Sequence, residues 1–164
     1  MGIKKLNAKR CARPMFHKLI YTDQKVTRRK EGVLYSKLLH DKAHNLTGKP
    51  DYIYAHIFTK RPFVVEIKSG EIGNDPHPRY GDLMQLTAYF FIANATFGRR
   101  PKKGWLMYRD CVFIIKNTKK LRKELLNVLV GMEQMLETSE GCAAPSFVQC
   151  RHCICRNTVC EHQP

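Results

Sequence analysis

The sequence predicts an α/β protein in which helices pack on a mixed β-sheet. Its 164 residues are 43% hydrophobic, which is enough for one compact domain with a sizeable core. Segments that alternate with the period of a strand are interspersed with longer segments of helical spacing. Their order is strand, strand, helix, strand, strand, helix, which is typical of a mixed sheet with helices on its faces.

The first half of the chain contains two predicted strands. Residues 51–58, "DYIYAHIF", alternate, are rich in β-formers and follow the turn-forming "TGKP". Residues 63–68, "FVVEIK", come after the short connection "TKRP" and are predicted as the antiparallel partner. Before these strands, residues 1–47 form a basic N-terminal segment without sustained periodicity, in which 11–20 fit a short helix.

The second half contains two predicted helices on either side of a strand pair. Residues 80–96 have the length and composition of a largely buried helix, and the loop 71–79 before them holds two prolines. The strands 104–110 and 111–117 meet in a turn. Residues 118–138 are predicted as a helix that lies against the sheet. Its signals are Thr118 as N-cap and, at helical spacing, Leu121, Leu125, Leu129 and Met132.

The chain is strongly basic, with a formal net charge of +15 at pH 7. The first 30 residues hold ten Lys or Arg against one acid, Asp23, and "RRPKK" spans 99–103. A surplus this large usually indicates a polyanionic partner, most often nucleic acid, whose phosphates exchange condensed counterions for Lys and Arg. A basic surface that only keeps the protein in solution is the alternative.

We expect a cytoplasmic protein without a membrane partner. No apolar segment approaches the roughly 18 residues that a membrane span needs, and the opening "MGIKKLNAKRC" lacks the apolar core of a secretory signal. Because cytosolic thiols are kept reduced, the seven cysteines indicate a metal site and not disulfides. Of these, Cys111 is expected in the core and Cys142 in a loop.

Glu66 and Lys68 stand two residues apart and so share one face of the predicted strand. A tight hairpin would bring Asp51 near Glu66. Two carboxylates at one end of a sheet suit Mg²⁺ or Mn²⁺, and an adjacent lysine can stabilise the charge that develops in phosphodiester hydrolysis. An exposed ion pair on an edge strand is the alternative for Glu66 and Lys68.

Gln85 and Tyr89 lie four residues apart on the predicted helix 80–96. Side chains at this spacing project from one helix face, so both can reach the end of the sheet that carries the carboxylates. The alternative is a helix that packs Tyr89 into the core with Gln85 at its edge.

Three short motifs, "KPD" at 49–51, "EIK" at 66–68 and "QLTAY" at 85–89, resemble the PD-(D/E)xK nuclease superfamily, in particular its RecB-like branch with the QxxxY motif. The resemblance implies a restriction-endonuclease-like core over 48–138 and a nuclease that depends on Mg²⁺ or Mn²⁺. By matching position, it assigns metal binding to Asp51, Glu66 and the backbone carbonyl of Ile67, assistance of hydrolysis to Lys68, and positioning of the metal site and DNA to Gln85 and Tyr89.

Members of this branch usually complete the metal shell with a His or an acid from an N-terminal helix. This chain has no clear counterpart of that helix before "GKPD". His17 is taken as the candidate ligand, with His40 and His44 as alternatives. Glu71 and Asp82 are acidic residues that can also reach the site.

Four cysteines crowd into the last fifteen residues, a density that indicates either zinc or an iron–sulfur cluster. Some RecB-like nucleases, among them the CRISPR-associated exonucleases and the nuclease subunit of AddAB-type helicases, bind a [4Fe-4S] cluster through a similar C-terminal triad and one early cysteine. The resemblance implies that a tail, 139–164, packs on the N-terminal segment through the ligands Cys11, Cys150, Cys153 and Cys160. Cys155 is the alternative fourth ligand, which would permit a Zn²⁺ site made of tail cysteines alone.

The resemblance implies a single nuclease domain over 1–164 that acts as a DNA exonuclease, preferably on single-stranded ends, and that works beside an integrase complex in CRISPR spacer acquisition. A stand-alone or viral recombination or repair nuclease of the same family is one alternative. A non-catalytic nucleic-acid-binding module with a zinc knuckle is an alternative of another class. Tyr80 or Trp105 is expected to stack on bases. The expected DNA contacts are Arg99, Arg100, Lys102 and Lys103.

Overall fold

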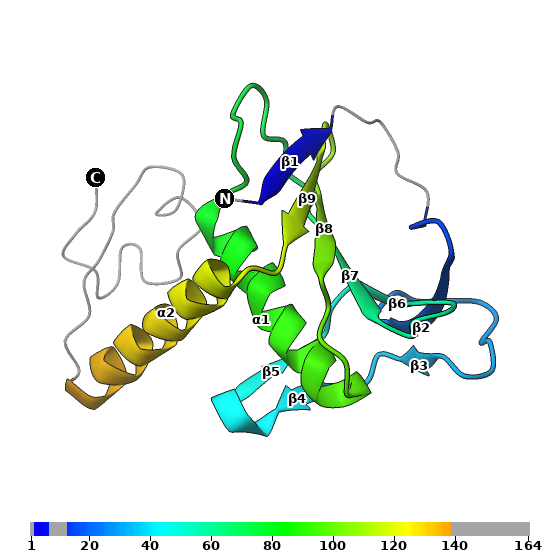
Figure 1. The fold of residues 1–164 in the computed structure, drawn as a ribbon, viewed down its shortest axis with the longest axis horizontal. Helices are drawn as coiled ribbons and strands as arrows, with labels where there is room; N and C mark the ends of the chain where they lie inside the picture. Colours follow the sequence, from blue (N-terminus) through cyan, green and yellow to red (C-terminus); the bar gives the residue numbers. More distant parts are fainter. Residues whose placement is uncertain (1, 7–12, 139–164) are drawn as a thin grey trace, which may run out of the picture. The chain divides into compact units, whose positions relative to one another are not determined.

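The structure is a computed structural model that describes residues 2–6 and 13–138. These residues form an α/β fold with a mixed sheet of seven strands, a two-stranded ribbon and two α-helices (Figure 1). The elements are β1 (Ile3–Leu6), β2 (His17–Thr22), β3 (Leu34–Tyr35), β4 (Leu39–Asp41), the 3₁₀ turn η1 (Lys42–His44), β5 (Leu46–Gly48), β6 (Tyr52–His56), β7 (Pro62–Ile67), α1 (Tyr80–Phe97), β8 (Lys103–Met107), β9 (Val112–Lys116) and α2 (Lys119–Thr138).

The large sheet has the strand order β1-β9-β8-β7-β6-β2-β3. The pairs β7–β8 and β2–β3 are parallel, and the other neighbours are antiparallel. The predicted mixed sheet is therefore confirmed, as are the antiparallel pairing of β6 with β7 and the presence of a strand pair at β8 and β9. Cys111, at the turn between β8 and β9, is buried as expected.

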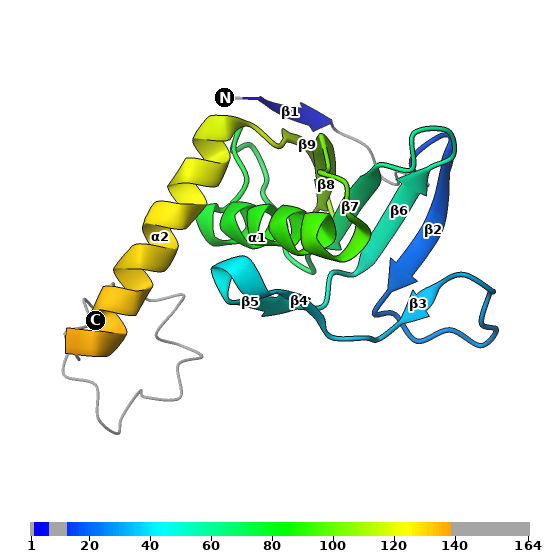
Figure 2. The same ribbon diagram turned by 60° about the horizontal axis from the view of Figure 1, so that its bottom comes forward.

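Helix α1 is the crossover that makes β7 and β8 parallel neighbours. It contacts these two strands and also the ribbon β4–β5, and Figure 2 shows it alongside both. Gly104 in β8 permits the close approach, because a Cβ there would lie 2.6 Å from the carbonyl oxygen of Val64 and 2.7 Å from the ring of Phe90. The predicted helix over 80–96 is confirmed with one further residue.

The N-terminal segment differs from the prediction. The short helix expected over 11–20 is wrong, because His17–Thr22 form the strand β2, which pairs with β6. Tyr21 and Thr22 become fully buried in this pairing. The backbone partner of β2 lies about 30 residues further along the chain, so no local periodicity indicates it.

Helix α2 begins as predicted after Thr118, whose hydroxyl oxygen accepts a hydrogen bond from the N–H of Leu121 at 3.2 Å. The chain divides into two compact units, Met1–Leu126 and Asn127–Pro164. In the first unit α2 buries Leu121 and Leu125, and in the second the structure describes its continuation to Thr138. The single domain over 1–164 stays a prediction. Neither described helix combines the length and the apolar character needed to cross a lipid bilayer.

Candidate active site

The register of the β6–β7 hairpin places Asp51 across from Glu66. Tyr52 pairs with Val65 at the end of the ladder, so Asp51 and Glu66 come next on the two chains and by alternation share one face. The charge of Asp51 acts on Glu66 and raises its pKa. The same face carries Ile53 and Val64, both fully buried, and α1 packs against it. The hairpin thus brings the two carboxylates together, as we expected from the sequence.

Glu66 is a buried acid with one unsatisfied oxygen. It is 5% exposed, and its Oε1 accepts a hydrogen bond from the amine of Lys68 at 3.1 Å. Its Oε2 is buried and has no hydrogen-bond partner among the residues that the structure describes. Burial, and then the charge of Asp51, raise the pKa of Glu66 from 4.5 to about 7, although Lys68 acts in the opposite direction. The arrangement calls for a proton or a cation at Oε2.

Lys68 sits in the middle of a polar network. Its amine donates to Glu66 Oε1 and to Gln85 Oε1, and it lies 3.3 Å from Asp82 Oδ1. Burial lowers the pKa of Lys68, but the charges of Glu66 and Asp82 outweigh this effect and leave the pKa above its ordinary value. Lys68 is therefore protonated at neutral pH, which suits it to stabilise negative charge and not to accept a proton.

One face of α1 supplies the remaining members of the network. Gln85 holds Lys68 through its carbonyl oxygen and donates from its amide nitrogen to the hydroxyl of Tyr89 at 3.0 Å. The hydroxyl of Tyr89 in turn donates to the backbone carbonyl of Lys49 at 3.4 Å. Asp82 lies one turn before Gln85 and accepts a hydrogen bond from the Tyr108 hydroxyl. The helix therefore connects the segment before Asp51 to the amine of Lys68.

Asp51 is oriented by two donors. Its Oδ2 accepts from the backbone N–H of Ile67, and its Oδ1 accepts from the side-chain amide of Gln24, both at 2.7 Å. The side chain of Ile67 is 45% exposed, and the expected part of its carbonyl in a metal shell stays a prediction. Sequence reasoning missed Gln24, because nothing local links it to Asp51. Asp82 had a usable signal, since it lies three residues before Gln85 on the same helix face.

The structure places His17 far from Asp51 along the sheet, whereas His40 lies in β4 and His44 in η1. His17 pairs with His56 at the end of β2 that lies furthest from Asp51, because β2 runs antiparallel to β6 and Thr22 is the residue next to Tyr52. His44 hydrogen-bonds Asp41 at 2.8 Å and contacts the ring of Phe91. His40 contacts Thr47.

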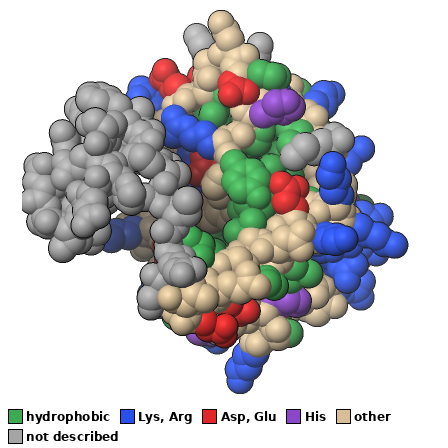
Figure 3. Space-filling model, turned by 90° about the vertical axis from the view of Figure 1, so that its left-hand side faces the viewer, with side chains coloured by type: hydrophobic (Ala, Val, Ile, Leu, Met, Phe, Trp, Pro, Cys, Tyr) green, Lys and Arg blue, Asp and Glu red, His purple; other side chains and the backbone are tan. Residues whose placement is uncertain are grey.

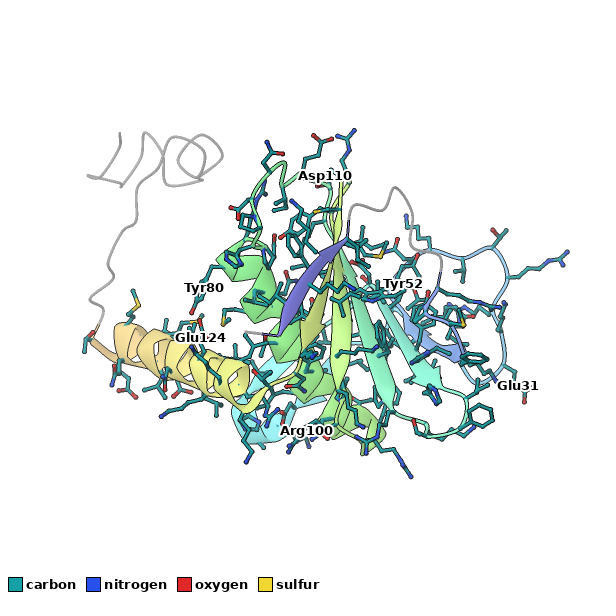
Figure 4. The ribbon with its side chains drawn as sticks, turned by 45° about the horizontal axis from the view of Figure 1, so that its top comes forward. Glu31, Tyr52, Tyr80, Arg100, Asp110 and Glu124 are labelled. Carbon is teal, nitrogen blue, oxygen red and sulfur yellow. The ribbon has the colours of Figure 1, made fainter. Side chains whose placement is uncertain are left out.

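Of the two further acidic residues expected near the site, one reaches it, and neither of the two aromatic residues expected to stack on bases belongs to the network. Glu71 turns toward Arg109, 3.7 Å away, in an exposed pair, whereas Asp82 reaches Lys68 as noted above. Tyr80 is half-exposed at the start of α1 and lies next to Glu124 of α2 (Figure 4). Trp105 packs edge-on against Phe63. It pairs with Val65 across β7 and β8 and so lies on the sheet face opposite Glu66.

The four expected DNA contacts lie apart from this network. Arg100, Lys102 and Lys103 line a pocket at the opposite end of β7 and β8, and the guanidinium of Arg99 donates to the backbone carbonyl of Thr59 at 3.1 Å. Figure 3 shows Lys and Arg side chains gathered along one side of the face that it draws.

Asp51 and Glu66 are the carboxylates of this network that could hold a divalent cation together. Residues 2–6 and 13–138 contain no cluster of three or more His, Cys, Asp or Glu side chains arranged to hold a metal, so protein ligation would rest on Asp51 and Glu66. The unsatisfied Oε2 of Glu66 is the observation that favours a cation there. The expected cluster ligands, Cys11, Cys150, Cys153 and Cys160, and the alternative Cys155 lie outside the described residues.

We compared the chain with protein families and with curated proteins. No protein-family model matches the chain, and no curated protein matches it significantly.

Proposed function

We propose that the protein is a divalent-metal-dependent deoxyribonuclease with a PD-(D/E)xK core. The observation that carries the proposal is the buried carboxyl of Glu66 next to the charge of Asp51 and the amine of Lys68. Its Oε2 lacks a partner among the described residues. Two carboxylates with an adjacent ammonium group can support metal-dependent phosphodiester hydrolysis.

In this proposal each side chain has a separate task. Asp51 and Glu66 hold Mg²⁺ or Mn²⁺, which when bound polarises a phosphoryl oxygen and lowers the pKa of water. Lys68 donates to the negative charge that develops on the phosphate oxygens. Gln85 keeps the amine of Lys68 in place, and Tyr89 keeps the amide of Gln85 in place.

The test is cleavage of end-labelled single-stranded DNA by the full-length protein with Mn²⁺ or Mg²⁺. We expect EDTA to abolish cleavage and Lys68→Ala to slow it by about 100-fold or more, the scale of losing one electrostatic donor. Lys123→Ala is the matched control for loss of a lysine, because its side chain is exposed and forms no ion pair with the described residues. DNA that stays intact with Mn²⁺ would favour a non-catalytic binding module, and cleavage that is unchanged in Lys68→Ala would show that Lys68 is not part of the active site.

The finer parts of the proposal rest on the resemblance to RecB-like nucleases. They are a preference for single-stranded ends, a role in CRISPR spacer acquisition with an integrase complex, and a [4Fe-4S] cluster in the tail. Protein purified without oxygen should be brown with broad visible absorption. Colourless protein with stoichiometric zinc would identify a zinc knuckle instead. A neighbouring integrase gene pair would support the CRISPR role, whereas a phage replication cassette would support the recombination alternative.

A further inference from the structure

The end of the sheet opposite the candidate active site is strongly basic. Because β7 and β8 are parallel, with Val64 next to Gly104, Lys103 lies beside the start of β7, whereas Glu66 and Lys68 lie at its other end. At ~3.3 Å per residue, Phe63 and Lys68 are about 16 Å apart along the strand. Figure 4 shows Arg100 and Asp110 at opposite ends of these strands.

This end contains a pocket of about 630 Å³ whose lining includes Lys and Arg side chains but no Asp or Glu. None of these cations forms an ion pair with an acidic residue of the described part of the chain. We call this surface the basic end. Its cations are Arg61, Arg100, Lys102, Lys103, Lys116, Lys119 and Arg122.

Arg122 of the basic end is held in place by neutral hydrogen-bond partners, so its positive charge is not neutralised. Arg122 donates to the backbone and side-chain oxygens of Asn117, both at 3.0 Å, and the amide of Asn117 donates to the carbonyl of Pro101 at 2.8 Å. Burial, and then the nearby charge of Arg100, lower the pKa of Arg122. Like charges are therefore fixed close together, an arrangement that a bound anion would stabilise.

Aromatic rings adjoin the same cations. A second pocket, of about 350 Å³, is lined by His17, His56 and Phe63 and shares Arg61, Lys102 and Lys103 with the first. The rings of His17 and His56 are 5.0 Å apart. Phe58, which is 77% exposed, lies 5.8 Å from the ring of His56. Aromatic rings together with Lys and Arg side chains are the combination that holds single-stranded nucleic acid.

The backbone at this place is strained. Phe16 and Lys60 adopt positive φ angles of 57° and 55°, in a region that is unfavourable for residues with side chains. The carbonyl of Phe16 accepts a hydrogen bond from the N–H of Ile57 at 2.9 Å, which ties the two strained segments together. Strain of this kind gathers at binding sites, and the side chains of Phe16 and Phe58 nearby are exposed.

We propose that the basic end, with His56 and Phe58, binds the sugar-phosphate backbone and bases of a single-stranded nucleic acid at a distance from the candidate active site. The pocket is concave, which suits a flexible strand better than a flat layer of anionic lipid. The inference extends the proposed nuclease function by giving its substrate a second contact, but binding itself requires no cleavage.

The experiment measures affinity of the full-length protein for a fluorescent oligothymidylate in EDTA, where no metal-dependent cleavage occurs. The test variant is Lys102→Ala with Lys119→Ala, two exposed pocket residues. Each lost phosphate contact lowers the slope of log affinity against log salt by about 0.7 for a single strand, so the pair should flatten it by about 1.4 and weaken binding about 25-fold at 0.1 M salt. The control is Lys4→Ala with Lys123→Ala, two exposed lysines that do not line the pocket.

A second variant tests the stacking part. Phe58→Leu should weaken binding of the oligonucleotide roughly 5- to 150-fold, the range for one lost base contact, and should leave binding of a duplex unchanged. Equal weakening by the test and control lysine pairs would show that only net charge matters and would overturn the inference. Tighter binding to phosphatidylserine vesicles than to the oligonucleotide would also overturn it. Normal binding without cleavage in Mn²⁺ would instead reject the proposed function and leave this inference standing.

Discussion

Replacing Glu66 by glutamine is expected to stabilise the protein at alkaline pH although it removes a proposed metal ligand. The pKa of Glu66 is about 7 in the folded protein and 4.5 ordinarily. Between these values the folded state keeps a proton that the unfolded state has lost, so stability falls as the pH rises through this window. Glutamine has the same shape and no charge, so it removes this dependence.

The size of the effect follows from the shift. A difference of about 2.5 pKa units corresponds to about 3 kcal/mol, of which about 2.5 kcal/mol is lost between pH 5 and pH 8. For a chain of this length this is a change of about 5–10 °C in melting temperature. Asp51 and Lys68, the charged neighbours of Glu66, are retained in the variant, so the difference between the two proteins isolates the carboxyl of Glu66.

The assay is thermal and urea unfolding of both full-length proteins at pH 5 and pH 8 in EDTA. The wild type should lose stability over this interval and Glu66→Gln should lose about 2.5 kcal/mol less, while the exposed Glu71→Gln should follow the wild type. Adding Mn²⁺ at pH 8 should raise the melting temperature of the wild type but not of Glu66→Gln. Parallel pH profiles for the wild type and Glu66→Gln would refute the reasoning, because Glu66 would then not be a buried acid with a raised pKa.

The remaining predictions concern packing, Lys68 and substrate length. Gly104→Ala should destabilise the protein by about 1–3 kcal/mol in urea unfolding, because the added Cβ would lie 2.6 Å from a backbone oxygen. Gly81→Ala, in α1, has open space around the added Cβ and should stabilise the protein by about 0.5–1 kcal/mol. Equal effects of the two substitutions would contradict the close packing at Gly104. Asp82→Asn should lower the pKa of Lys68 in an NMR titration of its amine, since one of the two charges that raise it is removed; an unchanged titration would place Asp82 outside the network. Affinity for oligonucleotides in EDTA should rise with length until the strand spans the ~16 Å between the two ends of β7. A dinucleotide that binds as tightly as a decamer would argue against two separate contacts.

Several parts of the candidate site were predictable because their signals are local. Glu66 and Lys68 must share a strand face, and Gln85 and Tyr89 must share a helix face, whatever surrounds them. The short connection between the two strands also made the approach of Asp51 predictable. The exposed ion pair that was the alternative for Glu66 and Lys68 does not occur, since Glu66 is 5% exposed.

Other parts of the site had no local signal. Gln24 reaches Asp51 only because β2 pairs with β6, and the same pairing carries His17 to the far end of the sheet. The segment 11–20 was misassigned for this reason, since its periodicity does not exclude a helix and its strand partner lies outside any local window.

The sequence by itself determined which residues alternate on a strand, which lie on one helix face, and the strong positive charge. These properties depend on residue type and on the two periods of the backbone, so they hold before the chain folds. Only the tertiary structure decided where the charge lies. The segment "RRPKK" lies at the end of the sheet opposite Glu66 because β8 pairs with β7 in parallel. The crossover through α1 sets that direction. This arrangement is long-range, so the spacing of nearby residues does not indicate it.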